Sequence, residues 1–192
     1  GIDITGGILV LDARDIDVIV VTGTDLTDLT ITTVLAGAER TVAADNLTFS
    51  DITDNGTAFT ITAVKKTAGS RLNFSFTATD GNILIAMAAA AIDTTGADGA
   101  GTGNLTLVTS AAGGTIKEAA DGNTIIVIPT AAVLALTAGS GSAGDIGGDA
   151  HSAAFAVTAT KLVLNSGGNM NIDTSVALTS LTMTIQDDTA AK

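Results

Sequence analysis

The stretch TKLVLNSGGNMNID, residues 160–173, contains the pattern that decides the fold. Leu162 and Leu164 alternate with other residues at a period of two, which is the period of a half-buried β-strand. The alternation stops at a small polar bend, residues 165–169, and an apolar alternation then resumes at Met170. The stretch therefore predicts two short strands joined by a tight bend.

The same unit of strand, bend and strand recurs along the chain. Each leading strand carries large apolar residues at positions i and i+2, and a bend rich in Gly, Asn or Asp follows it. By subtraction of their residue numbers, the leucines that lead these units are 25 to 33 residues apart. They are Leu47, Leu72, Leu105, Leu134 and Leu162. The sequence therefore contains an irregular structural repeat.

An irregular repeat of this length favours an all-β fold of the β-solenoid type. In a solenoid each coil stacks on the one below, so the inward residues must stay in register while the loops vary in length. Residues 94–103 and 138–148 are low in complexity, and we expect them to be lateral loops because the strand pattern resumes after each. Residues 1–192 are accordingly interpreted as one β-rich structural domain.

An antiparallel β-sandwich is the alternative fold. In that arrangement the bend at residues 166–169 would be a hairpin loop. Sandwiches commonly use large aromatic side chains to fill the space between two sheets that lie about 10 Å apart. The chain has no Trp or Tyr and only five Phe, so its composition favours the narrower core of a solenoid.

The composition of the chain argues against several classes of partner and site. The net charge is −12, and eight Lys and Arg residues are too few for a basic surface that binds phosphates, so nucleic acid is not expected as a partner. There is no Cys, which excludes disulfides and thiolate metal sites. The longest apolar run, residues 83–92, is too short to span a membrane as a helix.

Residues 103–185 resemble the coils of filamentous-haemagglutinin and autotransporter-type surface adhesins. The resemblance rests on GNLTLVTSAAGGTIKEA (103–119), on the Gly-Asp-Ile-Gly turn at 144–147 with the LVLNSGGNMNID segment (162–173), and on ALTSLTMTI (177–185). In that family a leucine-bearing strand and a Gly-Gly-Asn bend recur in right-handed parallel β-helices. The resemblance implies a right-handed parallel β-helix at the cell surface, with host-surface or matrix glycans as partners.

We expect a non-catalytic, extracellular structural or adhesive protein that assembles with itself. The strands near the two ends of the chain contain few of the Pro and Lys residues that normally protect a sheet edge from pairing. Such edges predict a head-to-tail homopolymer, a surface filament or layer. The alternatives are an excised segment of a giant secreted adhesin and a carbohydrate-active β-helix enzyme. The expected assembly edges are Ile2, Ile4, Leu178, Leu181, Met183 and Ile185.

Two acidic clusters in the first 28 residues are candidates for a Ca²⁺ site. Hard oxygen ligands at close spacing suit Ca²⁺, although neither an EF-hand loop nor a Gly-Gly-x-Gly-x-Asp repeat is present. Solvated turn aspartates are the competing interpretation, and no other cofactor is expected. The candidate ligands are Asp12, Asp15, Asp17, Asp25 and Asp28.

If these aspartates bind Ca²⁺ in the folded state alone, Ca²⁺ should raise the melting temperature. A ligand at 100 times its dissociation constant stabilises the folded state by about 2.7 kcal/mol. The measurement is a thermal melt in millimolar Ca²⁺ against chelator at equal ionic strength, and a variant with Asp15 and Asp17 changed to Asn is the control. Identical melts of the unmodified chain in both solutions would exclude the site.

The other polar motifs have simpler explanations. His151 is the only histidine, and with Asp149 it could suggest a Ser-His-Asp arrangement, but no nucleophile-elbow motif follows a strand. An exposed loop histidine is the better interpretation. Four Asn-x-Ser/Thr sequences are candidate glycosylation sites in a host that modifies exported proteins. They begin at Asn46, Asn55, Asn73 and Asn104.

Overall fold

The chain forms two β-sheets in which every described pair of strands is parallel. The structure is a computed structural model, and it describes residues 8–9, 15–19, 30–32, 46–52, 58–65, 70–78, 81–85, 90–96, 99–118, 125–140, 144–147 and 154–186. Within these ranges no residue is helical, and no helix long and apolar enough to cross a membrane occurs. The predicted all-β class is confirmed for this part of the chain.

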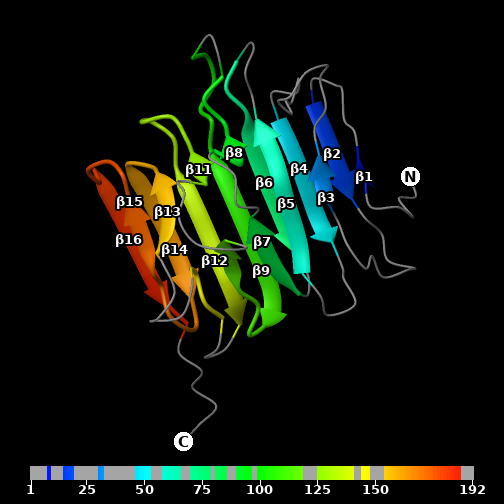
Figure 1. Cartoon of the computed structure of the whole chain (residues 1–192), viewed down its shortest axis with the longest axis vertical. Helices are drawn as coiled ribbons and strands as arrows, with labels where there is room; N and C mark the ends of the chain where they lie inside the picture. The colour runs from blue at the N-terminus through cyan, green and yellow to red at the C-terminus, as the bar shows by residue number, and fades with distance from the viewer. Residues whose placement is uncertain are drawn as a thin grey trace, which may run out of the picture.

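The sixteen strands are divided between a seven-stranded and a nine-stranded sheet (Figure 1). The seven-stranded sheet consists of β2 (Asp15–Ile19), β4 (Asn46–Ile52), β6 (Asn73–Ala78), β9 (Leu105–Ala112), β12 (Leu134–Ser140), β14 (Lys161–Ser166) and β16 (Ser180–Ile185). The nine-stranded sheet consists of β1 (Ile8–Leu9), β3 (Thr30–Thr32), β5 (Ala58–Lys65), β7 (Asn82–Ile85), β8 (Ile92–Asp93), β10 (Ile116–Glu118), β11 (Ile126–Val127), β13 (Phe155–Thr158) and β15 (Ile172–Thr174).

The chain visits the two sheets in turn. After β12 it passes to β13 in the nine-stranded sheet, returns to β14, passes to β15 and returns again to β16. Parallel neighbours need a crossover connection, and here each crossover runs through the opposite sheet. Neighbouring strands of a sheet are therefore about one sequence repeat apart. Leu134, for example, lies opposite Leu105 on one side and Leu162 on the other.

A further line of parallel contacts in the nine-stranded sheet runs beside its main strand order, through β7 and β10. Ile83 in β7 lies opposite Ile116 in β10, and single bridges then join Ile116 to Ile146 and Ile146 to Met170. Residues 138–148, where a lateral loop was predicted, thus contain the end of β12 and the bridging Ile146. Residues 94–96 and 99–104 connect β8 to β9, where the other loop was predicted.

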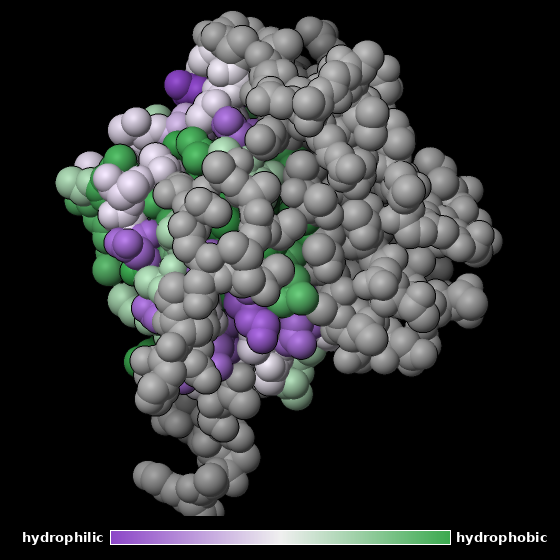
Figure 2. Space-filling model, viewed as in Figure 1, coloured by the Kyte–Doolittle hydropathy of each residue, from purple (hydrophilic) through white to green (hydrophobic). Residues whose placement is uncertain are grey.

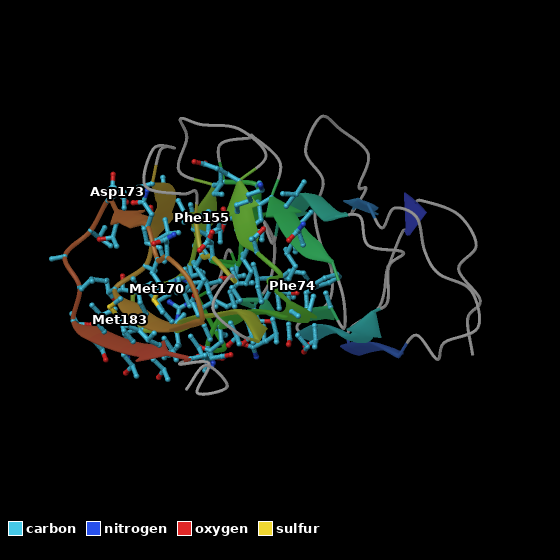
Figure 3. All side chains as sticks on the ribbon, turned by 90° about the horizontal axis from the view of Figure 1, so that it is seen from below. Phe74, Phe155, Met170, Asp173 and Met183 are labelled. Carbon is cyan, nitrogen blue, oxygen red and sulfur yellow. The ribbon has the colours of Figure 1, made fainter. Side chains whose placement is uncertain are left out.

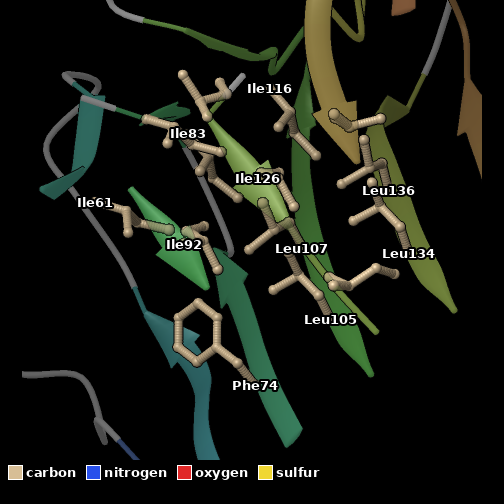
Figure 4. Close-up of a cluster of buried hydrophobic side chains, with 14 of the residues drawn as sticks. Ile61, Phe74, Ile83, Ile92, Leu105, Leu107, Ile116, Ile126, Leu134 and Leu136 are labelled. Carbon is tan, nitrogen blue, oxygen red and sulfur yellow. The ribbon is translucent and has the colours of Figure 1, made fainter. Parts of the chain in front are cut away.

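The core lies between the sheets and is built from aligned apolar side chains (Figure 4). In β14 buried residues alternate with more accessible ones, which is the alternation that the sequence predicted. The apolar alternation of the sequence predicts nine inward residues between 105 and 172, of which Met170 and Ile172 are the last two. The other seven are buried, with at most 3% of their surface exposed: Leu105, Leu107, Ile116, Leu134, Leu136, Leu162 and Leu164. Met170 and Ile172 are only partly buried, and they pack against the core from its C-terminal end.

Two details of the predicted repeat are corrected. Leu72 is buried but precedes β6, and the residue opposite both Leu47 and Leu105 is Phe74. The interval between units at this point is therefore 27 residues before Phe74 and 31 after it, by subtraction of the paired residue numbers. The antiparallel alternative is contradicted in the described strands, because all of their pairs are parallel.

Candidate functional site at the C-terminal ends of the sheets

The candidate site lies where the inward rows of the seven-stranded sheet end. In the last strand, β16, Leu181 lies opposite Leu162, Met183 opposite Leu164, and Ile185 opposite Ser166. Leu162, Leu164 and Ser166 are buried, at 2%, 3% and 0% exposure. Residues that lie opposite one another on neighbouring strands of a parallel sheet face the same side of the sheet. The three apolar residues of β16 therefore occupy core positions.

These core positions are uncovered. Leu181 is 49% exposed, Met183 52% and Ile185 72%, and Leu178 just before the strand is 39% exposed. Figure 2 shows hydrophobic surface along the margin of the molecule where β15 and β16 lie in Figure 1. We call these four residues, together with the partly buried Met170 and Ile172, the C-terminal face.

The C-terminal face spans both sheets. Ile172 belongs to β15, the last strand of the nine-stranded sheet, and Met170 precedes it. Figure 3 shows Phe155 and Met170 between the two layers, Met183 at the end of the molecule, and Asp173 on the outer side. The face is thus a cross-section through the core, with apolar groups inside and a polar residue at its margin.

Hydrogen bonds fix β16 on the sheet despite its exposure. The Gln186 backbone N–H donates to the Ser166 carbonyl at 2.9 Å, and its side-chain amide donates to Asn165 Oδ1 at 2.9 Å. Before the strand, the Thr179 N–H donates to the Thr160 carbonyl at 2.7 Å. The last strand is therefore held at both of its ends, and it presents its apolar side chains in a fixed position.

One edge of β16 has no strand beside it among the described residues. β16 pairs with β14 and is the last strand in the order of its sheet. An unprotected edge of this kind is a template for pairing with another strand. Full burial of an apolar side chain contributes about 1.5–3 kcal/mol, so covering the exposed 49% of Leu181, 52% of Met183 and 72% of Ile185 would contribute about 3–5 kcal/mol in total. The arrangement can therefore bind a further strand.

Asparagine side chains join successive turns of the chain, a role that the sequence did not indicate. Asn73 Oδ1 accepts hydrogen bonds from the Thr102 hydroxyl at 2.6 Å and the Asn104 N–H at 3.1 Å, and Asn104 Oδ1 accepts one from the Val133 N–H at 3.0 Å. Both had been considered as glycosylation sites. The available signal was that Asn73 and Asn104 each stand directly before an apolar strand.

Several predicted site residues lie outside the described residues. They are Ile2, Ile4, Asp12, Asp25, Asp28, Asn55 and His151. Asp15 and Asp17 lie in β2, which pairs with β4, and the backbone of this strand is described. In the described part of the chain no three His, Cys, Asp or Glu residues gather into a group that could hold a metal ion. The Ca²⁺ site therefore stays a prediction from the sequence.

Because comparisons with known proteins give no match, the function of the chain is inferred from the surfaces of the molecule. No protein-family model, curated protein or solved structure matches the chain. A fold alone does not define a function, because functions belong to sites. The C-terminal face is the described site with the largest exposed apolar side chains, so the functional argument begins there.

Proposed function

We propose that the chain is a non-catalytic, extracellular structural protein, a right-handed β-solenoid that polymerises end to end. The solenoid is supported by parallel partners about one repeat apart and by crossovers that pass through the opposite sheet. Right-handed crossovers are the strong preference for parallel strands. The extracellular location rests on the resemblance of residues 103–185 to surface adhesins.

The single observation that carries the proposal is the uncovered core at β16. Solenoid proteins normally close such an end with a polar cap, because each coil contacts only its neighbours. Here the terminal row positions hold Leu181, Met183 and Ile185, and the segment from Leu178 to Ile185 has no charged residue. A surface of this composition is stabilised by a further coil, and a second copy of the chain can supply one.

The closest alternative is that further coils of a longer adhesin cover the same face. Both arrangements place a parallel strand on β16, and they differ in whether the strand belongs to the same chain. In that alternative the adhesin would bind host-surface or matrix glycans. A carbohydrate-active enzyme is a third alternative, and a reducing-sugar assay on polysaccharides tests it directly.

Leu181→Lys tests the proposal. We expect the unmodified protein to form fibres visible by electron microscopy and the variant to sediment as a monomer, because the ammonium group would lie in the apolar junction. Leu181 is already 49% exposed, so the free energy of unfolding of the subunit should fall by only about 1 kcal/mol.

Thr182→Lys is the matched control. Thr182 is also exposed, in the same strand, but it is one position along and faces the opposite side. The control adds the same charge, and its fibres should be as long as those of the unmodified protein. Should the unmodified protein stay monomeric at high concentration, with and without Ca²⁺, the end-to-end proposal fails and the longer adhesin replaces it.

A further inference from the structure

Three rows of the seven-stranded sheet cross all of its strands in unbroken register. One row runs through Asp17, Thr48, Ser75, Thr106, Ala135, Val163 and Thr182. The row before it begins at Ile16 and ends at Leu181, and the row after it begins at Val18 and ends at Met183. β2 and β16 thus stand at opposite ends of the same rows.

The nine-stranded sheet ends on the same two sides. Its order begins with β1 and finishes with β15, so β1 and β2 stand at one side of the molecule and β15 and β16 at the other (Figure 1). A translation along the stacking direction therefore brings β2 of one copy beside β16 of another. These two strands keep the parallel sense in that arrangement.

We infer that the C-terminal face binds the first coil of a second copy, with β2 of that copy added to β16 in the register of the existing rows. Ile16 then lies opposite Leu181, Asp17 opposite Thr182, and Val18 opposite Met183. This inference rests on the proposed function and specifies its junction. The contact is heterologous, so it repeats along a filament and does not close as a dimer.

The charges of the two strands favour this pairing over the alternatives. β16 has no charged residue, so its Ser180 and Thr182 positions accept Asp15 and Asp17 without like-charge repulsion. Two copies of β2 side by side would bring aspartates together. Two copies of β16 would give an isologous dimer in which β2 of neither copy takes part.

Engineered disulfides test the register, because the chain contains no Cys that could interfere. Opposite residues on neighbouring strands are about 4.8 Å apart, within the range of about 4.4–6.8 Å between the Cα atoms of a disulfide. The test protein carries Thr182→Cys and Asp17→Cys. The matched control carries Thr184→Cys and Asp17→Cys, whose Cα atoms would be about 8 Å apart in the inferred register.

Mild oxidation of fibres of the test protein should give a ladder of covalent multimers on a non-reducing gel, with about tenfold less product from the control. The single variant Thr182→Cys should give no covalent dimer. More product from the control, or a dimer from Thr182→Cys alone, would overturn the register while fibres still support the proposed function. Absence of fibres in the unmodified protein would overturn both.

Discussion

Leu164→Asp is expected to abolish the cooperative unfolding transition of the protein. Leu164 is 3% exposed, and it lies opposite Leu136 on one side and Met183 on the other. Burying a carboxylate without a partner costs several kcal/mol, and loss of a buried leucine costs a further ~2–5 kcal/mol. Together these approach the ~5–15 kcal/mol that stabilises a typical domain. The measurement is a thermal melt followed by circular dichroism.

Val163→Asp is the control for that variant. Val163 is the next residue of β14 and is 40% exposed on the outer side of the sheet. Its carboxylate stays in water, so the cost should be about 1 kcal/mol, from the lower strand propensity of Asp. Similar melts for the two variants would contradict the alternation of inward and outward positions in this strand.

The inward positions of the strands were predictable because they depend on local chemistry. A period of two places Leu105 and Leu107 on one face whatever their strand pairs with, and both are buried. The pairing itself is a long-range property. The length of the repeat favoured parallel partners, and the parallel registers confirm this for the described strands.

For some residues the sequence gives no local signal of the partner that they bind. Ile146 pairs through single bridges to Ile116 and Met170, and a stretch rich in Gly, Ala and Ser around it resembled a loop. Asn73 and Asn104 bond backbone groups of neighbouring turns, whereas in the sequence they were typical of bends and glycosylation motifs. In each case the partner lies about 24 to 31 residues away, so only the long-range pairing of the chain identifies it.

The candidate site could be predicted in part. The absence of Pro, Lys and charge between Leu178 and Ile185 predicts an unprotected edge, and in the structure Leu181, Met183 and Ile185 are exposed in the last strand of the sheet order. The sequence could not show that these residues continue buried rows. The distinction matters for the function of the face. An exposed apolar residue at a core position is stabilised when a further strand covers it, whereas a single exposed residue on an outer face needs no explanation.

The second prediction concerns the close stacking of turns, which Gly96→Ala should disrupt. Gly96 has φ +64°, and a Cβ at this position would lie 2.7 Å from the Ser70 carbonyl oxygen and 2.8 Å from the Arg71 nitrogen. Both contacts are with backbone atoms. The two backbone segments are held together nearby, because the Leu72 N–H donates a hydrogen bond of 3.2 Å to the Thr94 carbonyl. The turns must therefore separate, and we expect a loss of at least ~3 kcal/mol.

Gly99→Ala separates this steric effect from the cost of the backbone conformation. Gly99 has a similar φ of +71°, but the nearest atom to its Cβ would be Arg71 Nη2 at 3.6 Å, the end of a flexible side chain. Left-handed backbone alone costs an L-residue about 1–2 kcal/mol.

For a chain of this size, 1 kcal/mol shifts the melting temperature by about 2–4 °C. Gly96→Ala should therefore lower the melting temperature by at least about 6 °C, clearly more than Gly99→Ala does, because only Gly96 touches the backbone of the neighbouring turn. Equal shifts would mean that conformation, and not the close approach of the turns, requires glycine at both positions.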